Sequence, residues 1–578
     1  MKTKILAALI ILSALILAVF SVKNDSVTTD ESPHITAGYS YLTQKDIRLN
    51  PEHPPLIKDL AALPLLFQKI NFDTNHYSWK TDINGQWSAG SHFLYESGNN
   101  PDTIAGASRL AILIIFALLC LMVFKWARAR YGDNTALFVL TLTALSPNIL
   151  AQARYVTTDI GASLAFITAA YFFVKQIKNP SGKNIFYAGL AFGLAQLLKF
   201  SLILLLPMFF IIIAALAWSE YNHRLKIFWN HFKRLLAVVI IGYLLVWPVY
   251  QFHVWNYPPE RQKSDTAFIL SSFPVKPAAR LVANMSDKPL LRPYAQYLLG
   301  LFMVLQRTGG GNTTYFMGEI SATAWKSYFP TVYILKEPLP ILILLLFSLI
   351  LAWPKPGLGQ ITVRLKKWIK NHTDELTWVV IIGIYWASSI SGNLNIGLRH
   401  VLPTFPFIYL LISGKIGQWI KPEGQRFPNP IKLSLAAILA LWYIIESVLT
   451  FPHYLAYFNE LAGGPANGYK YAADSNLDWG QDLKRLKDFV EKNKIEKIKV
   501  DYFGGGSPRY YLGNKYEQLN PNNSDQRHGW IAVSATLLQG GRGQAAKGYD
   551  RDTTYYRWLD EYEPISKIGY SIFVYKID

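Results

Sequence analysis

Long apolar runs separated by short polar segments fill most of the chain before residue 452. A helix that crosses a membrane needs roughly 20 mostly apolar residues, and the pattern predicts about eleven such spans. The first run, Ile5–Val22, lacks a convincing small-residue cleavage site, so we interpret it as a retained anchor and not as a signal peptide. The predicted spans cover residues 5–22, 103–124, 135–152, 159–174, 185–199, 200–218, 235–252, 329–353, 376–392, 396–414 and 432–451.

The polar segments between the spans alternate in character. Short basic segments occur at every second connection, which indicates that they face the cytoplasm. The N-terminus is then inside, and the long segments 23–102 and 253–328 lie outside together with everything after about residue 452. The inside segments are Lys125–Arg130, Lys175–Lys183, Arg224–Arg234, Lys355–Lys370 and Lys415–Lys432.

The tail, residues 453–578, has the composition of a soluble domain, so we divide the chain into a membrane domain 1–452 and an outer domain 453–578. Apolar periodicity predicts a helix over Leu483–Lys492, and alternation predicts three strands. A small α/β domain follows from this pattern. A glycine run at 309–311 predicts a flexible loop and lacks the Lys-Ser/Thr of a phosphate loop. The predicted strands are Ile495–Phe503, which Gly504–Gly506 follows, Trp530–Ala535 and Ser571–Tyr575.

Composition supports a mainly α membrane protein. Hydrophobic residues make up 51% of the 578 residues and charged residues only 16%, against roughly 25% charged in a soluble domain. This balance argues against disordered, fibrous and ordinary cytosolic proteins. The net charge of +19 lies mostly in the inside segments, so it reports orientation and not nucleic-acid binding. A single cysteine, Cys120, excludes an intrachain disulfide framework and a cysteine-based metal site.

The first outer segment begins with an acidic pair, Asp30 and Glu31, directly before Ser32, Pro33 and His34. Ser32 suits the N-cap of a helix and Pro33 suits its first turn. The two carboxylates then lie at a helix N-terminus close to the membrane surface. Helix capping and solvation are the usual explanation of acidic residues before a helix, so their types alone do not establish a catalytic role.

A second Pro-started helix follows in the same segment, after Glu52 and His53 in the sequence Asn-Pro-Glu-His-Pro-Pro. Leu56, Leu60 and Leu63 recur on one face, which is typical of an amphipathic helix on a membrane surface. The two helices are expected to frame a site that holds carboxylates and histidine.

Several cations lie at outer ends of the predicted spans. Charged side chains are costly within a membrane and tend to face a cavity or a partner. If these cations gather on one outer face, they suit a phosphate-bearing ligand. Each cation alone is also explained as an interfacial anchor, and the Arg154–Asp159 pair is also explained as a salt bridge. They are Arg154 with Asp159, Lys199, and Arg399 with His400.

The acidic segment Asp474–Asp482 follows the last span. Its carboxylates are candidates for binding a sugar or a cation, or for capping the next helix, and their spacing is not that of a calcium-binding EF-hand. Trp479 is a candidate for stacking on a sugar or for an interfacial position.

Taken in order along this topology, the motifs resemble the GT-C superfamily of membrane glycosyltransferases, in particular the protein O-mannosyltransferase type and the bacterial lipid A aminoarabinose transferases. The resemblance covers most of residues 1–482. It rests on Asp30-Glu31, Asn50–Leu56, Arg154 with Asp159, Gly318–Ser321 with Tyr328–Pro330, Asn395–His400 and Pro452–Asp482.

The resemblance implies an inverting transfer of a sugar from a polyprenyl-phosphate donor to an acceptor hydroxyl at the outer membrane face. Asp30 then matches the general base, Glu31 holds the acceptor, and Asp159 orients a cation or the acceptor. The remaining matched residues contact the substrate or the leaving phosphate: Arg154, Lys199, Arg399, His400 and His34.

Metal use varies across the superfamily, so Glu52 and His53 are candidate ligands of a divalent ion, although two neighbouring residues do not make a site. The acceptor is a lipid, a glycan or a protein. The Trp-Trp-Asp signature of oligosaccharyltransferases is absent, which disfavours en bloc transfer to asparagine. We expect the cytoplasmic membrane of a bacterium as the location. A transporter or flippase of a lipid-linked or anionic solute is the main alternative, and a scaffold whose tail binds a partner is a weaker one.

Overall fold

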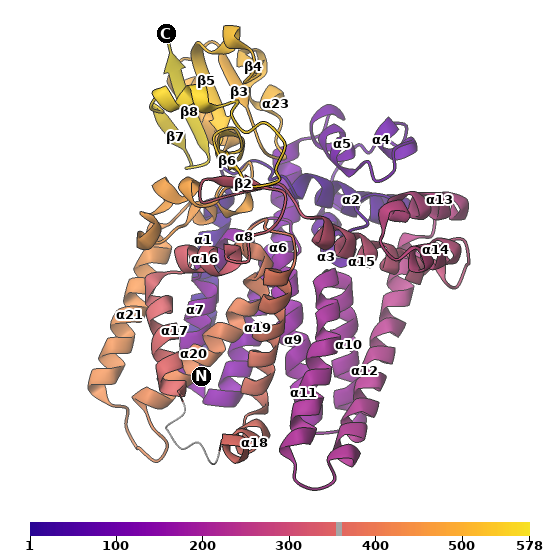
Figure 1. The fold of residues 1–578 in the computed structure, drawn as a ribbon, viewed down its shortest axis with the longest axis vertical. Helices are drawn as coiled ribbons and strands as arrows, with labels where there is room; N and C mark the ends of the chain where they lie inside the picture. The colour runs from indigo at the N-terminus through magenta and orange to yellow at the C-terminus, as the bar shows by residue number, and fades with distance from the viewer. Residues whose placement is uncertain (354–360) are drawn as a thin grey trace.

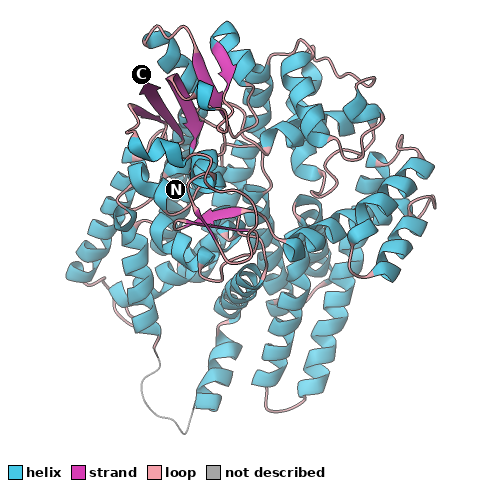
Figure 2. Cartoon of the chain, turned by 45° about the horizontal axis from the view of Figure 1, so that its top comes forward, coloured by secondary structure: helices cyan, strands magenta, loops and turns pink. Residues whose placement is uncertain are grey.

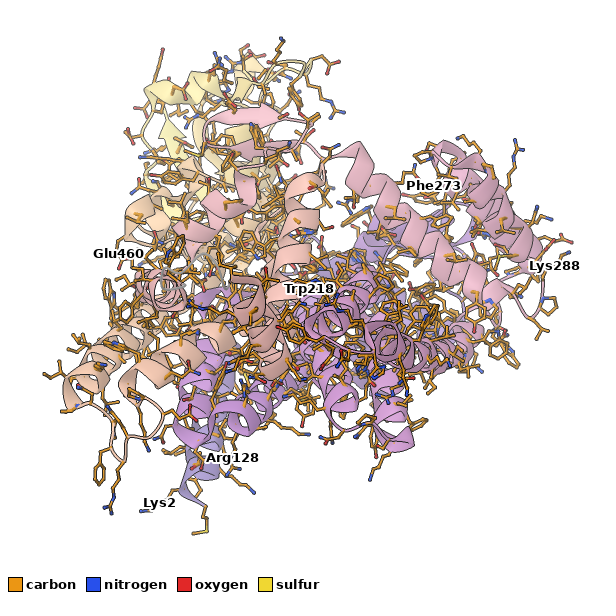
Figure 3. The ribbon with its side chains drawn as sticks, turned by 60° about the horizontal axis from the view of Figure 1, so that its bottom comes forward. Lys2, Arg128, Trp218, Phe273, Lys288 and Glu460 are labelled. Atoms are coloured by element: carbon orange, nitrogen blue, oxygen red, sulfur yellow. The ribbon has the colours of Figure 1, made fainter. Side chains whose placement is uncertain are left out.

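The computed structural model describes residues 1–353 and 361–578; of the predicted inside segment Lys355–Lys370, residues 355–360 lie outside this range. Long helices run side by side in a bundle, and shorter helices lie across one end of it (Figure 1). A small sheet near the C-terminus covers that same end. In Figure 3, Lys2 and Arg128 mark the opposite end of the bundle.

Six stretches of helix are long and apolar enough, by length and composition, to cross a membrane among the described residues. All of them except the largely buried α9 also expose large apolar side chains on the bundle surface, as expected where lipid is the solvent. They are α1 (Lys2–Val22), α6 (Pro101–Tyr131), α9 (Asp159–Lys178), η3 with α11 (Phe200–Leu204 and Leu205–Ser219), α12 (Arg224–His253) and α21 (Pro430–Leu449).

The other predicted spans are helical too, but they are broken, shorter or less apolar. The span predicted at 329–353 is α16 (Tyr328–Lys336) and α17 (Leu339–Ala352), which meet at 117°. Counting that bent pair as one span gives seven, so the figure of about eleven stays a prediction. The remaining helices of the bundle are α7 (Asp133–Ala144), α8 (Pro147–Gln152), α10 (Gly182–Leu198), α19 (Thr373–Ser391) and α20 (Phe405–Ile420), with α18 (Ile361–Asn371) at the bundle end opposite the sheet (Figure 1).

The two long outer segments fold into the helical layer across the bundle end. Phe273 and Lys288 mark the part that projects to one side (Figure 3). The first segment forms α2 (Glu31–Gln44), α3 (Leu56–Ala62), η1 (Leu63–Phe67), α4 (Tyr77–Lys80), α5 (Gln86–Ser91) and η2 (His92–Glu96). The second forms α13 (Pro259–Ile269), η4 (Leu270–Ser272), α14 (Lys276–Met285) and α15 (Arg292–Gly310).

Two local predictions in this layer are wrong. The N-cap of α2 is Asp30 and not Ser32, because the Glu31 amide already closes a turn onto the Thr28 carbonyl at 3.2 Å. The glycine run is not a free loop either. Helix α15 continues through Gly310, and its C-cap is Gly311, whose φ of +82° is a backbone conformation that glycine adopts without strain.

The tail contains a five-stranded sheet of order β4-β3-β5-β8-β7. Strands β3 and β5 are parallel, whereas β8 pairs antiparallel with β5 and β7. The predicted helix, now α22 (Leu483–Lys492), and the three predicted strands are confirmed, while β4 and β7 are too short to give a pattern. The strands are β3 (Ile498–Asp501), β4 (Tyr516–Gln518), β5 (Gly529–Ser534), β7 (Ser566–Ile568) and β8 (Ile572–Ile577).

A second small sheet joins the tail to the second outer segment (Figure 2). Strands β1 (Thr314–Phe316) and β2 (Glu319–Ser321) form a hairpin, and β6 (Gln544–Ala545) of the tail pairs parallel with β2. The first outer segment also contacts the tail, because a Cβ on Gly505 would lie 2.2 Å from the Thr28 carbonyl oxygen. The tail therefore packs on both outer segments and holds them over the bundle end.

Short helices complete the chain between these elements. They are η6 (Leu398–His400), η7 (Leu402–Thr404), η8 (Tyr454–Ala456), η9 (Glu460–Ala462), η10 (Pro465–Lys470), η11 (Asp474–Asn476), α23 (Pro508–Leu512), η12 (Gly513–Lys515), η13 (Ser524–Gln526), α24 (Ala535–Gly540) and η14 (Arg557–Glu561).

Candidate functional site

A cavity of about 490 Å³ lies where the outer layer, the outer ends of bundle helices and the start of the tail meet. It receives side chains from both outer segments, from the ends of α10 and α19, from η6 and from η11. Nine of the residues singled out in the sequence line it: Asp30, His34, Glu52, His53, Lys199, Arg399, His400, Asp474 and Trp479.

Four charged groups at this cavity form one continuous network. The Arg399 guanidinium lies 2.8 Å from the Asp30 carboxylate and 3.5 Å from that of Asp159. Lys199 Nζ lies 2.6 Å from the other oxygen of Asp159. Asp159 itself is buried, with 1% of its side chain exposed. Asp159 therefore holds two cations that face the cavity, and Asp30 contacts one of them, Arg399, from the N-terminus of α2.

Helix ends position this network. Asp30 is the N-cap of α2, Asp159 is the first residue of α9, and Lys199 is the C-cap of α10. Acidic residues at helix N-termini and a cation at a C-terminus are favoured by the helix dipole. The sequence thus places each charge where the local backbone stabilises it, and the packing of three helices brings the charges together.

Arg399 is held on several sides. Its Nε donates to Ser475 Oγ at 3.1 Å, and its guanidinium lies 4.3 Å from the centre of the Trp479 ring. Gly397 permits this approach, because a Cβ there would lie 2.4 Å from Ser475 Oγ. The φ of Gly397, +128°, also suits glycine alone. Trp479 is buried and has its ring against Arg399, so the guanidinium occupies the place that a stacked sugar would take.

The two histidines of the outer layer meet edge to face, with ring centres 4.9 Å apart. Burial lowers the pKa of His34, helped by Lys58, although Asp30 acts in the opposite direction. Burial also lowers the pKa of His53, and His34 and Lys58 add to the effect. Both rings are therefore neutral near pH 7. His34 is fixed by a hydrogen bond of 2.9 Å between Nδ1 and the Val156 carbonyl.

Lys58 supports the loop that carries Glu52 and His53. It is fully buried, and its three N–H groups are shared among four acceptors at 2.8–3.0 Å from Nζ: the Tyr41 hydroxyl, the two oxygens of Asn50 and the His53 carbonyl. Burial lowers the pKa of Lys58 to about 7. Asn50 adopts a positive φ of 52°, a conformation that asparagine tolerates, and Lys58 satisfies the acceptors that the tight loop turns inward.

Glu31 and Arg154 lie away from the cavity, contrary to their expected contacts with acceptor and phosphate. Glu31 is fully buried in an ion pair with Arg109 at 2.6 Å and accepts from the Val156 amide at 3.1 Å. Arg154 is buried against Asp25 at 3.2 Å. The tail closes over this region, so each charge must find a protein partner. These buried ion pairs hold the start of the first outer segment in place next to the cavity.

We expect Glu31→Gln to destabilise the protein strongly. The substitution leaves Arg109 charged and buried without its anionic partner, which costs about 3–5 kcal/mol in buried pairs. Thermal unfolding in detergent measures the loss, with Glu96→Gln as the matched control, because 61% of the Glu96 side chain is exposed. A Glu31→Gln protein that unfolds at the wild-type temperature would contradict this structural role.

The candidate metal ligands Glu52 and His53 both line the cavity. Glu52 accepts hydrogen bonds from the side-chain amides of Gln86 and Asn84. Over residues 1–353 and 361–578, no group of three or more His, Cys, Asp or Glu side chains is arranged to hold a metal ion. A divalent ion at Glu52 and His53 stays a prediction without a complete ligand set, and we route no step through it.

Other cavity residues were not singled out in the sequence. Arg307 comes from the end of α15, and Gln86 with Trp87 comes from α5. Asp474, by contrast, belongs to the acidic segment that the sequence did single out, and it lines the cavity from η11. Burial raises the pKa of Asp474 to about 6, although Arg399 acts to lower it. Arg307, Gln86 and Trp87 lie in the two long outer segments, where no sequence pattern separates a cavity residue from a solvated one. Only the packing of the two outer segments and the tail distinguishes them.

Residues 103–247 match the family model described as dolichyl-phosphate-mannose-protein mannosyltransferase. No curated protein matches the chain. The matched residues run from α6 to α12 and include Asp159 and Lys199.

Among solved structures, the S. cerevisiae protein O-mannosyltransferase Pmt1–Pmt2 complex bound to the sugar donor is similar, with a TM-score of 0.50 and 10% identity over 78% of this chain and 90% of that chain. ArnT from Cupriavidus metallidurans bound to undecaprenyl phosphate gives a TM-score of 0.32 and 10% identity, over 98% of this chain and 97% of the other. The Archaeoglobus fulgidus oligosaccharyltransferase gives a TM-score of 0.41 and 13% identity, over 89% of this chain and 60% of that chain.

Proposed function

Because this chain has the fold of the GT-C superfamily of membrane glycosyltransferases, we propose that it moves a sugar from a polyprenyl-phosphate donor to an acceptor hydroxyl. The transfer takes place at the outer face of a bacterial cytoplasmic membrane and inverts the anomeric carbon. One observation carries the proposal: the network of Asp30, Arg399, Asp159 and Lys199 lines or borders a single cavity at the end of a bundle with that fold.

Asp30 is the proposed general base. Its Oδ2 pairs with Arg399, and its Oδ1 makes no hydrogen bond with any side chain in the described part of the chain. That oxygen is available to take the proton of the acceptor hydroxyl. As the proton leaves, the acceptor oxygen forms a bond to the anomeric carbon, and the bond from that carbon to the phosphate oxygen breaks with its electron pair passing to the phosphate.

The cations are proposed to stabilise the lipid phosphate as it leaves. Lys199 and Arg399 are held by the buried Asp159, and Arg307 lines the same cavity from α15. Fixed cations aimed at developing charge lower the barrier without having to reorganise. A helical bundle full of lipid-facing side chains would let the polyprenyl chain stay in the membrane while its phosphate enters the cavity.

The proposal is tested by incubating the purified protein with a panel of polyprenyl-phosphate sugars and candidate acceptors, followed by mass analysis. We expect release of polyprenyl phosphate coupled to a glycosylated product. A flippase would instead move the lipid-linked sugar across reconstituted vesicles without chemical change. Movement without product would overturn the proposal in favour of that alternative.

We expect donor binding to weaken as pH rises from 5 to 7. The pKa of Asp474 is raised from 3.8 to about 6, so its carboxyl is neutral at the acid end and becomes an anion beside Arg399 as pH rises. A nearby like charge costs the donor phosphodiester about 1 kcal/mol, or roughly fivefold in Kd. The diester keeps one negative charge over this range, so its own ionisation does not contribute.

The measurement is the Kd of a polyprenyl-phosphate sugar at several pH values in wild type and in Asp474→Asn. The variant is expected to bind at every pH as wild type does at pH 5. If the Kd changed equally with pH in both proteins, the result would contradict the role of Asp474.

A further inference from the structure

The cavity has a second polar wall that the proposed chemistry leaves unused. It consists of Asn50, Glu52, Gln86 and Trp87, all from the first outer segment; we call these four residues the amide wall. It contains no lysine or arginine, whereas Lys199, Arg307 and Arg399 line the cavity from other elements. A carboxylate repels phosphate, so the amide wall suits a neutral ligand.

Hydrogen bonds fix the amide wall before any ligand arrives. The Asn50 side-chain amide donates to Gln86 Oε1, and Gln86 Nε2 donates to Glu52 Oε1. The Asn84 side chain donates to the other oxygen of Glu52 at 3.3 Å, and its Oδ1 accepts from the Asn50 backbone amide at 2.8 Å. Asn50 and Gln86 are buried. Their planar groups are therefore set in orientation, and ligand binding need not order them.

Glu52 is the informative member of this wall. It lines the cavity, and within residues 1–353 and 361–578 it forms no ion pair, only hydrogen bonds from neutral amides. A carboxylate held by two amides keeps further lone pairs for hydroxyl donors. Lys58 acts on Glu52 electrostatically but makes no ion pair with it. A carboxylate at a cavity wall that no cation contacts directly fits a ligand that offers several O–H groups.

Trp87 adds an exposed apolar surface to the polar groups of the amide wall. It follows Gln86 directly on α5, lines the cavity, and has 53% of its surface exposed. An exposed indole ring beside a cavity offers a flat apolar face together with one N–H donor. Trp479, the other tryptophan at the cavity, is buried against Arg399 and does not offer such a face.

We infer that the amide wall is a binding subsite for a pyranose ring. The ring stacks its C–H face on Trp87 while adjacent hydroxyls donate to Glu52 and bond the Gln86 amide. This inference deepens the proposed function, on which it rests for the origin of the sugar. The ring belongs either to the donor or to a saccharide acceptor, and both present the same chemistry.

Binding of methyl hexopyranosides of mannose, glucose and galactose to the purified protein tests the subsite, measured by saturation-transfer NMR, with the acyclic polyol sorbitol as the negative ligand. We expect at least one pyranoside to bind, Trp87→Ala to weaken binding tenfold or more, and Trp87→Phe to retain most of it. Glu52→Gln is expected to weaken binding without altering thermal stability by the amount seen for Glu31→Gln.

Trp255→Ala is the matched control, because Trp255 is an outer tryptophan that is 65% exposed and does not line the cavity. Competition with a polyprenyl-phosphate sugar then separates the sources. Displacement of the pyranoside by the donor assigns the ring to the donor, and simultaneous binding assigns it to the acceptor.

Absence of binding by every pyranoside, or binding unchanged in Trp87→Ala, would overturn the inference. The readout needs no turnover. Sugar transfer with no Trp87-dependent pyranoside binding would reject the subsite alone, whereas Trp87-dependent binding without transfer from any donor would reject the proposed function alone.

Discussion

Asp30→Asn is expected to abolish sugar transfer while the protein still inserts and folds. Loss of a positioned general base typically costs 10²–10⁴-fold in rate. Asparagine keeps the shape of the side chain, and its oxygen can still accept from Arg399, which lies 2.8 Å away. The amide cannot take a proton from the acceptor. The effect should therefore fall on kcat, with donor binding changed much less.

The matched control is Asp550→Asn, which removes one carboxylate from an exposed position in the tail. Initial rates of product formation and the Kd of the donor are measured for both variants, together with thermal stability in detergent. Transfer by Asp30→Asn within a few-fold of wild type would remove Asp30 from the mechanism. A tenfold loss of donor affinity at an unchanged kcat would instead make it a binding residue.

The sequence predicts those parts of the molecule that depend on local pattern. Apolar runs identify α1, α6 and α12, and the tail pattern identifies α22 with three strands of the larger sheet. Short helices and three-residue strands such as β4 are less predictable, because neither contains a full period of apolar residues. The start of α2 is misplaced by one or two residues, since a backbone turn at Thr28 decides it and not the Ser32 side chain.

The same division applies to the site. Asp30, Lys199 and Arg399 are recognisable because a charge at the end of an apolar span needs a cavity or a partner. Glu31 carries the same sequence signal as Asp30 but turns the other way, toward Arg109. Asp30 and Glu31 are neighbours in the chain, yet one side chain lines the cavity and the other forms a buried ion pair. Tertiary packing, which the local sequence does not reveal, determines which of the two faces the cavity.

Arg399→Lys is expected to lower the rate of transfer about 10²–10³-fold, as loss of a fixed donor to a developing anion does in other enzymes. Lysine keeps the charge but not the planar fork. Arg399 reaches Asp30, Asp159 and Ser475 and lies on the Trp479 ring. A single ammonium group cannot keep all four contacts, so the charge moves away from the position that the leaving phosphate needs.

Donor affinity and kcat in Arg399→Lys are measured beside Arg280→Lys, a change at an exposed arginine of α14. Lys199→Gln is expected to weaken transfer by a smaller factor, since Asp159 still has Arg399. An unchanged rate in Arg399→Lys would show that net charge suffices and that the fork geometry is irrelevant.

The double variant Asp30→Asn with Arg399→Lys shows whether the pair acts as one unit. Groups in direct contact have strongly non-additive effects, whereas independent groups multiply their losses. Because we propose that Arg399 both orients the carboxylate that takes the proton and faces the leaving phosphate, we expect the double variant to be little slower than Asp30→Asn alone. A loss equal to the product of the two single losses would mean that the ion pair at 2.8 Å couples nothing in the reaction. Arg399 would then act on the phosphate independently of the base.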